Sequence, residues 1–199
     1  KKKISKKLSS INANELKAKA IEEHMNGNYA SASEKYQAFL NRGINDPDVI
    51  SNLALICQEN GQINKALKLY ENCISQFPSH TFSACNLSFL YLTLGKIDKA
   101  ENTINDVLKR DTKIANAYSV LGLILKEKGK IIDAETATKK ALEINPDLAE
   151  AYVNLGSIYK LKNQLDKAET SIKKALTINP NYAGAYINLG SILKEKGFL

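Results

Sequence analysis

The chain has 199 residues, of which 44% are hydrophobic and 25% charged, and a formal net charge of +7. These proportions are typical of a globular protein. No apolar run approaches the roughly 20 residues that a membrane-spanning helix requires, and the basic N-terminus lacks the apolar core of a secretory signal peptide. Composition therefore excludes a protein anchored through apolar membrane helices.

The excess positive charge is concentrated at the N-terminus. Five lysines within the first seven residues leave a balance of +2 for residues 13–199. A nucleic-acid-binding surface needs enough basic side chains to neutralise phosphates, so no nucleic-acid partner is expected. We interpret residues 1–12 as a basic tail, with contact to nucleic acid or anionic lipid as the alternative use.

The three cysteines, Cys57, Cys73 and Cys85, are odd in number and lack metal-ligand spacing. Unpaired cysteines favour a reducing, cytoplasmic compartment, and neither a metal nor another cofactor is expected. Lysine far outnumbers arginine, and asparagine and isoleucine are plentiful. This usage indicates an AT-rich bacterial genome.

A 34-residue segment recurs along the chain, and self-similarity at such a period predicts a stacked array of repeats. The best copies are the fourth and fifth, which share their tyrosine, Leu-Gly, alanine and proline positions. The predicted repeats 1 to 5 are residues 13–46, 47–80, 81–114, 115–148 and 149–182, followed by a partial repeat 6 at 183–199.

Each repeat carries two apolar stripes with i, i+3, i+4, i+7 spacing, which predicts two helices. In repeat 5 the first stripe runs from Tyr152 to Tyr159 and the second from Leu165 to Leu176. Glycine separates the stripes in every repeat except repeat 5, where Asn163 replaces it, and both residues favour the left-handed conformation that ends a helix. The expected fold is all-α, a right-handed solenoid of stacked antiparallel helix pairs.

Small residues recur at two positions of the repeat. The eighth is glycine in repeats 4 to 6, and the twentieth is alanine in repeats 1 to 5. A glycine inside a helix costs about 1 kcal/mol relative to alanine, so its recurrence needs a packing reason. We expect the two helices of a repeat to approach closely at these positions.

This order of aromatic, Leu-Gly, aromatic, glycine, alanine and proline residues at a period of 34 resembles the tetratricopeptide repeat. The resemblance covers residues 13–199, although Leu16, Ile50 and Ala84 replace the leading aromatic residue in repeats 1 to 3. It implies that the first helices line a concave groove in which a partner protein or peptide binds, without a small-molecule substrate.

Asparagine recurs at the sixth position, interrupted by Ala18 and Val120. Its amide can pair with both the C=O and the N–H of a passing peptide. The row resembles the asparagine ladder of O-GlcNAc transferase-type arrays, which grips substrate backbone. The alternatives are helix–helix contacts or inheritance through repeat duplication. Four apolar residues are also expected to line the groove unless neighbouring repeats bury them. The predicted groove residues are Asn52, Asn86, Asn154, Asn188, Leu55, Phe82, Phe89 and Leu123.

The carboxylate clamp, another binding mode of this family, does not fit the sequence. Lys17 and Asn52 match its pattern, but Ile21, Phe82 and Asn86 stand where the clamp requires asparagine, lysine and arginine. We therefore reject the clamp.

No catalytic site is expected. Neither of the two histidines, His24 and His80, has a second metal ligand at a suitable spacing. Their sequence positions also do not pair them with a serine or cysteine nucleophile. The expected function is a non-enzymatic protein-interaction scaffold. The alternative is the substrate-recruiting N-terminal region of a larger transferase, for example a glycosyltransferase, sulfotransferase or methyltransferase.

Repeat 6 lacks its second helix, so its first helix is expected to expose apolar core residues. We expect either that the parent chain continues past Leu199 or that this end meets another molecule, including a second copy.

Overall fold

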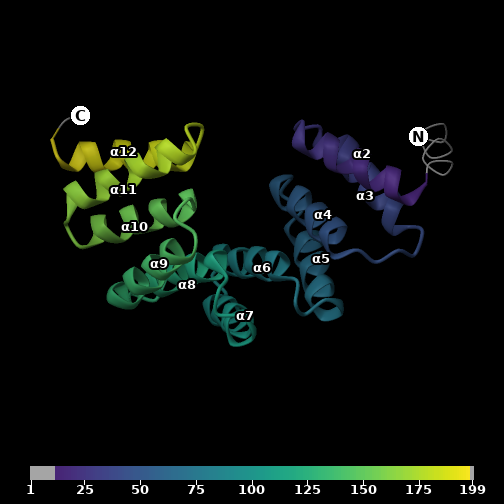
Figure 1. The fold of residues 1–199 in the computed structure, drawn as a ribbon, viewed down its shortest axis with the longest axis horizontal. Coiled ribbons are helices and arrows are strands. Elements are labelled where there is room, and N and C mark those ends of the chain that lie inside the picture. Colours follow the sequence, from purple (N-terminus) through teal and green to yellow (C-terminus); the bar gives the residue numbers. More distant parts are fainter. Residues whose placement is uncertain (1–11, 198–199) are drawn as a thin grey trace. The chain divides into compact units, whose positions relative to one another are not determined.

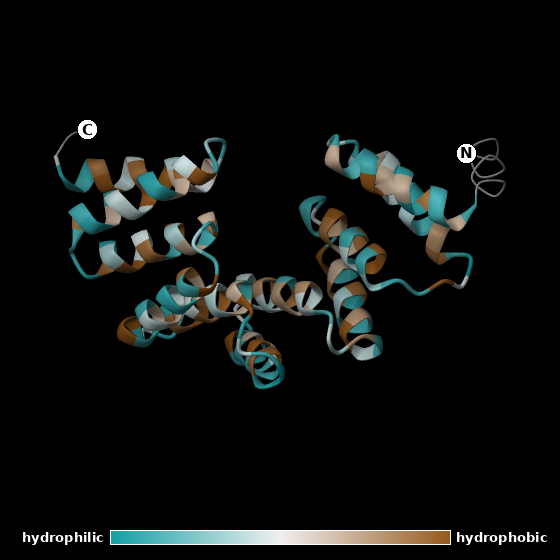
Figure 2. Ribbon diagram, viewed as in Figure 1, coloured by the Kyte–Doolittle hydropathy of each residue, from teal (hydrophilic) through white to brown (hydrophobic). Residues whose placement is uncertain are grey.

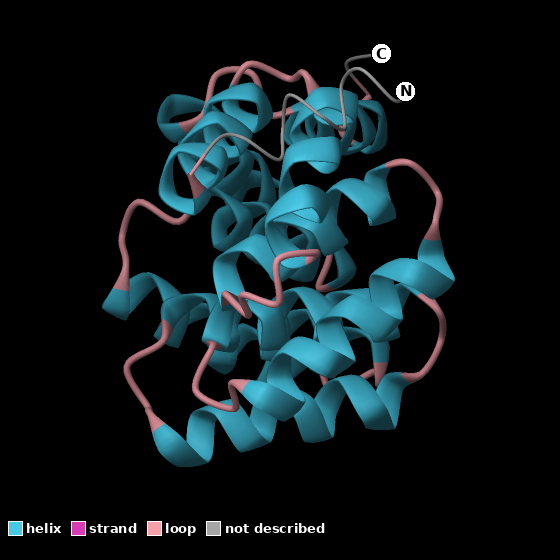
Figure 3. Cartoon of the chain, turned by 90° about the vertical axis from the view of Figure 1, so that its right-hand side faces the viewer, coloured by secondary structure: helices cyan, strands magenta, loops and turns pink. Residues whose placement is uncertain are grey.

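The computed structural model describes residues 12–197, in which all regular secondary structure is helical (Figure 3). No helix in this range is long and apolar enough to cross a membrane. The basic tail lies outside the described residues except for Asn12, whose side chain caps the first helix. The helices, labelled in Figure 1, are α2 (Ala13–Met25), α3 (Tyr29–Leu40), α4 (Pro47–Glu59), α5 (Ile63–Gln76), α6 (Thr81–Thr93), α7 (Ile97–Arg110), α8 (Ala115–Glu127), α9 (Ile131–Ile144), α10 (Ala149–Leu161), α11 (Leu165–Ile178) and α12 (Ala183–Glu195).

The predicted solenoid of antiparallel helix pairs is confirmed. The first helices α2, α4, α6, α8, α10 and α12 begin at the first residue of each predicted repeat. Figure 2 shows both hydrophobic and hydrophilic residues along the helices, as the apolar stripes require, although α6 is mostly apolar. Left-handed residues separate the paired helices, among them Gly129 with φ 74° and Asn163 with φ 56°.

The chain forms two compact parts, which we call the N-terminal body (residues 1–87) and the C-terminal body (residues 88–199). In the N-terminal body α2 packs on α3, α3 on α4, and α4 on α5. In the C-terminal body α8 pairs with α9 and α10 with α11, while α10 contacts both α8 and α12. The first helices α8, α10 and α12 therefore form one continuous layer.

The small eighth and twentieth positions lie against each other, as predicted. At the eighth position of repeat 3, the Ser88 hydroxyl donates to the carbonyl of Ala100, the twentieth residue, at 2.7 Å. In repeat 5, a Cβ on Gly156 would lie 2.6 Å from Ile172 Cδ1 and 3.2 Å from the Ala168 carbonyl oxygen. A larger side chain there would displace the Ile172 side chain and crowd the Ala168 carbonyl.

Gly190 occupies the same position on α12, but no heavy atom lies within 4 Å of where its Cβ would stand. The neighbouring Tyr186 is 54% exposed, whereas its counterpart Tyr152 in repeat 5 is only partly exposed. In repeat 5, α11 packs on one face of α10. Among the described residues, no helix packs on the corresponding face of α12.

Ion pairs, most of them between partly buried side chains, join successive repeats of the C-terminal body. A lysine at the fourteenth position reaches back to acidic side chains on the second helix of the preceding repeat. The pairs are Lys128 with Glu101 (2.6 Å) and Asp98 (3.4 Å), Lys162 with Glu135 (2.6 Å), and Lys196 with Glu169 (2.6 Å) and Asp166 (2.7 Å). We call these contacts the lysine bridges.

The lysine bridges lower the pKa of the glutamates that they contact. Hydrogen bonds from Lys139 and Lys162 hold the pKa of Glu135 at about 2, and hydrogen bonds from Lys173 and Lys196 do the same for Glu169. Because a lowered pKa in the folded state means that folding favours the ionised form, these groups stabilise the fold above their ordinary pKa of 4.5. That stabilisation disappears as the pH falls toward 2.

We therefore expect the C-terminal body to lose stability between about pH 4.5 and pH 2. The Glu135→Gln variant should show a shallower loss over this interval, because one of the titrating carboxylates is gone. Urea denaturation followed by circular dichroism at several pH values measures the effect. An unchanged pH dependence in Glu135→Gln would contradict it, and the exposed Glu143→Gln provides a control.

Candidate functional site

The first helices of the C-terminal body border an open cavity of about 720 Å³. Its lining comes from α8, α10 and α12 and from the turn that follows α8, and its surface is polar and apolar in about equal measure. The lining residues are Lys126, Glu127, Gly129, Ser157, Lys160, Leu161, Asn188 and Glu195. Of the eight predicted groove residues, Asn188 lies in this lining.

The asparagines of this body connect neighbouring first helices. The Asn154 amide on α10 donates to Ser119 on α8, to its carbonyl oxygen at 3.3 Å and its hydroxyl at 3.1 Å. The Asn188 amide donates to the Gly184 carbonyl at 2.8 Å, while its Oδ1 accepts from the Ser157 hydroxyl at 3.2 Å. Both side chains are half-buried. Each asparagine thus holds two first helices together, and neither residue is fully buried.

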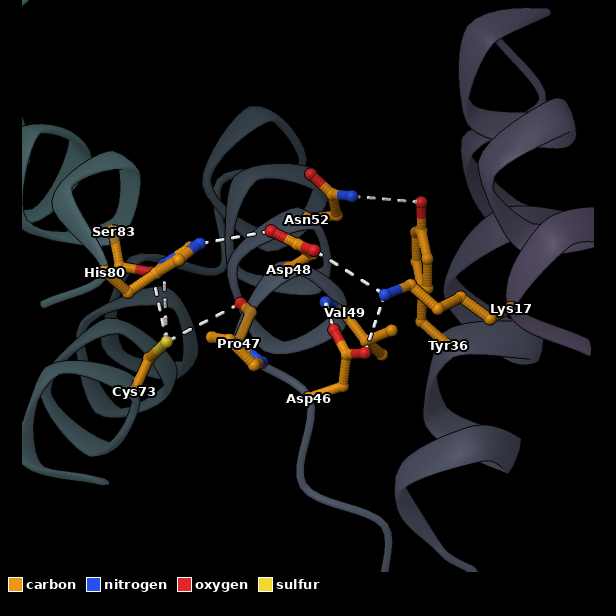
Figure 4. Close-up of polar contacts among 10 residues, drawn as sticks. All are labelled: Lys17, Tyr36, Asp46, Pro47, Asp48, Val49, Asn52, Cys73, His80 and Ser83. Atoms are coloured by element: carbon orange, nitrogen blue, oxygen red, sulfur yellow. Dashed lines mark hydrogen bonds and ion pairs between the residues drawn. The ribbon is translucent and has the colours of Figure 1, made fainter. Parts of the chain in front are cut away.

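The asparagines of the N-terminal body face tyrosines instead. Asn52 donates to the Tyr36 hydroxyl at 3.3 Å, and that hydroxyl also lies 3.4 Å from Nδ1 of His24 (the Asn52–Tyr36 bond appears in Figure 4). Tyr36 is fully buried, and burial raises the pKa of its hydroxyl, opposed by the hydrogen bond from Asn52. The pair therefore lets a buried tyrosine hydroxyl keep a hydrogen-bond partner.

The same arrangement recurs one repeat later. Tyr70 is fully buried, and burial raises the pKa of its hydroxyl while the neighbouring Asn86 amide opposes the rise. Among the described residues, neither the Tyr70 hydroxyl nor Asn86 Nδ2 has a hydrogen-bond partner of good geometry. Gln58 occupies the position that His24 has in repeat 1, and its Oε1 also lacks such a partner. The Tyr70–Asn86 pair therefore resembles its predecessor in placement but lacks the hydrogen bond.

The tyrosine pairing does not extend along the whole asparagine row. In the N-terminal body the twenty-fourth residue of one repeat, Tyr36 or Tyr70, lies against the sixth residue of the next, Asn52 or Asn86. In the C-terminal body the twenty-fourth residues of repeats 4 and 5 are Thr138 and Ile172. Asn154 and Asn188 there bond to neighbouring first helices instead.

The predicted apolar residues are placed as follows. Leu55 on α4 and Leu123 on α8 are half-buried, while Phe82 and Phe89 on α6 are exposed. The edge of the His80 ring contacts the Phe82 ring, with centroids 6.4 Å apart. Exposed phenylalanine rings on a first helix are available for contact with a partner.

A polar cluster in the N-terminal body, drawn in Figure 4, was not expected from the sequence. Nε2 of His80 lies 3.1 Å from Asp48 Oδ1, and its Nδ1 lies 2.7 Å from the Ser83 hydroxyl, which is 3.1 Å from the Cys73 sulfur. Asp48 also pairs with Lys17 at 3.5 Å. The cluster ties α2, α4, α5 and α6 to one another.

The cluster has the residue types of a catalytic triad, but its geometry does not suit one. Ser83 is fully buried, so no substrate could reach its hydroxyl, and burial raises the pKa of Cys73, which disfavours a reactive thiolate. Within residues 12–197, no group of three or more histidine, cysteine, aspartate or glutamate side chains could hold a metal ion. Sequence spacing gave no signal for this cluster because Asp48 and His80 lie 32 residues apart.

Comparisons with known proteins agree with this architecture. Models of the tetratricopeptide repeat match residues 58–124, 115–148 and 149–182, which together make up more than half of the chain. Comparison with curated proteins found no matching sequence.

Solved structures share the fold at low sequence identity. A thermophilic TPR protein of Thermus thermophilus is 22% identical, with a TM-score of 0.81 over 92% of this chain and 100% of that one. A tetratricopeptide repeat protein from Parabacteroides merdae is 23% identical, with a TM-score of 0.66 over 94% of this chain and 74% of that one. A chain of the APC/C hetero-tetramer Cut9–Hcn1 is 16% identical, with a TM-score of 0.84 over 93% of this chain and 37% of that one.

The chain is thus an α-solenoid built from two-helix repeats. It belongs to the tetratricopeptide repeat family. In general terms its repeats form a scaffold for protein interaction.

The tyrosine–asparagine pairing makes a prediction that a double-mutant cycle can check. Tyr36→Ile and Asn52→Val each remove one partner of the hydrogen bond between the Asn52 amide and the Tyr36 hydroxyl, and each should lower the free energy of unfolding by about 1–3 kcal/mol. The double variant reproduces the Ile104 and Val120 combination and should cost less than the sum of the two by about 1 kcal/mol or more. Urea denaturation followed by circular dichroism gives these free energies. Strict additivity of Tyr36→Ile and Asn52→Val would show that the two side chains do not act as a pair.

Proposed function

We propose that the protein is a non-catalytic scaffold that binds an extended segment of a partner protein along its first helices. The observation that carries the proposal is the open cavity formed by α8, α10 and α12, because it presents half-buried amide and hydroxyl groups on a rigid helical layer. Polar groups of this kind orient a ligand, while the surrounding helices are held in place by their own packing.

The spacing of the repeats suits a peptide backbone. Packed neighbouring helices lie about 8–10 Å apart, and an extended chain advances about 3.3–3.6 Å per residue, so each repeat meets about three residues of ligand. Asn154 and Asn188, one on each of two adjacent first helices, would then contact the backbone at regular intervals. Contacts to the backbone bind many sequences with similar strength, which suits a scaffold.

Apolar side chains would add to these backbone contacts. In the C-terminal body the proposed contacts are Phe89, Leu123 and the exposed Leu161. In the N-terminal body the proposed contacts are Asn52, Leu55, Phe82 and Asn86. The amide N–H groups of the two asparagines face tyrosines, so their amide oxygens remain to accept hydrogen bonds from ligand N–H groups.

We also propose that the protein works in a reducing, cytoplasmic compartment. Cys57, Cys73 and Cys85 are free thiols and all three are buried, where they pack as small apolar side chains.

Self-association through the uncovered face of α12 is a second proposed interaction. This face carries Tyr186, Leu189, Gly190 and Leu193, and the glycine at its centre lets another helix approach closely. Large residues flank Gly190 on this face of α12. Two copies of the chain would therefore pair through the same face in an isologous contact, with the two glycines at its centre.

The peptide proposal is tested at the asparagines. The variant with Asn154→Ala and Asn188→Ala should bind unrelated peptides more weakly, by a similar factor for each peptide, because the lost contacts are to the backbone. Fluorescence anisotropy with a panel of labelled peptides measures the change. Asn102→Ala, an exposed asparagine on α7, is the matched control, and unchanged affinity in the double variant would reject the ladder.

Self-association is tested at Gly190. The open space around this residue means that Gly190→Leu should fold normally, yet the leucine should prevent the close approach of a second copy. Sedimentation velocity over a range of concentrations should show dimers for the wild-type chain and monomers for the variant. A wild-type chain that stays monomeric at all concentrations would overturn this part of the proposal.

A further inference from the structure

A row of lysines crosses the first helices of the C-terminal body. Lys126 on α8, Lys160 on α10 and Lys194 on α12 all occupy the twelfth position of their repeats, and the first two line the cavity. Since neighbouring packed helices lie about 8–10 Å apart, the row offers one ammonium group per helix along the direction proposed for the ligand.

The lysines of the cavity lie deeper than the carboxylates that pair with them. Lys160 contacts Glu195 at 2.8 Å and the Ser191 hydroxyl at 2.6 Å, and Lys126 contacts Glu127 at 3.1 Å. The side chains of Lys126 and Lys160 are 19% and 28% exposed, whereas Glu127 and Glu195 are each 48% exposed. The glutamates can rotate into solvent, while the lysine stems remain packed in the groove.

This difference in depth allows an exchange of partners. Ion pairs between partly exposed side chains contribute little to stability, so a carboxylate that arrives on a ligand can replace Glu127 or Glu195. The released glutamates regain full hydration, and the lysines keep a partner of the same chemistry. The site can therefore receive acidic groups without leaving a buried charge unpaired.

We propose that this lysine row selects acidic peptides: the groove binds an extended segment with an acidic side chain at every third residue. The inference rests on the proposed function and adds the ligand class. A polyproline II segment has three residues per turn and rises about 3.1 Å per residue, so acidic side chains at i and i+3 lie on one side, about 9 Å apart. That separation matches the spacing of adjacent first helices.

The conformation of the bound peptide matters because a peptide in the β-strand conformation would not place successive acidic side chains on the same side. In a strand, side chains at i and i+3 point to opposite faces. The exposed Leu161 lies beside Lys160 in the cavity and can contact the residues between successive acidic groups. These lysines are separate from the carboxylate-clamp positions rejected above, which lie in repeats 1 to 3.

The test uses the full chain and fluorescent peptides of four Glu-Pro-Ala triplets or four Gln-Pro-Ala triplets. The glutamate peptide should bind about tenfold more tightly than the glutamine peptide, and the ratio of the two affinities should fall to about one in the variant with Lys126→Gln and Lys160→Gln. An isomer of the glutamate peptide with its acidic residues grouped at one end should bind more weakly than the regular repeat.

Two variants control for charge and folding. Lys126→Arg with Lys160→Arg keeps the charge and should retain the preference for the glutamate peptide. Lys174→Gln removes one exposed charge from α11, on the other helix of repeat 5, and should leave both affinities unchanged.

The ways in which the inference can fail are distinguishable. Equal binding of the glutamate and glutamine peptides would overturn the acidic preference and leave the proposed scaffold function intact. Binding of neither peptide would count against the proposed function itself. Tighter binding of a twelve-nucleotide oligouridine than of the glutamate peptide would overturn the inference in favour of nucleic acid.

Discussion

The close approach of the two helices within each repeat is the constraint on which the rest of the structure depends. Glycine or another small residue at the eighth position faces alanine at the twentieth, so that Gly156 meets Ile172 and the Ala168 carbonyl almost without a gap. This contact fixes the paired helix, which in turn fixes the next first helix. The layer formed by α8, α10 and α12, and thus the cavity between their side chains, follows from that packing.

The helices could be predicted from the sequence because their determinants are local. The period of 34, the apolar stripes and the turn residues identify every first-helix start. The partners of individual polar side chains depend on contacts between repeats, which periodicity does not specify. The asparagine row could therefore be seen as a pattern in the sequence. The placement of Tyr36 and Tyr70 beside it could not be predicted, and the pairing of Asp48 with His80 could not be predicted either. The residues of the cavity were only partly foreseen: Asn188 was predicted, whereas Lys126 and Lys160 were not.

Hydrogen bonds and ion pairs both connect neighbouring repeats. In the N-terminal body the Asn52 amide donates to Tyr36, and Lys17 pairs with Asp46 and Asp48. In the C-terminal body the Asn154 amide donates to Ser119, and the lysine bridges join the second helix of one repeat to the first helix of the next. Salt screens ion pairs more than buried hydrogen bonds, so the lysine bridges are the more salt-sensitive contacts.

The side-chain contacts between first helices also make the junctions between repeats non-interchangeable. The Asn154 amide donates to the carbonyl oxygen and the hydroxyl of Ser119, the fifth residue of repeat 4. If repeat 4 were lost and repeat 3 joined directly to repeat 5, the corresponding residue would be Cys85, which has no hydroxyl. Repeats of similar sequence are therefore matched to their own neighbours in the chain.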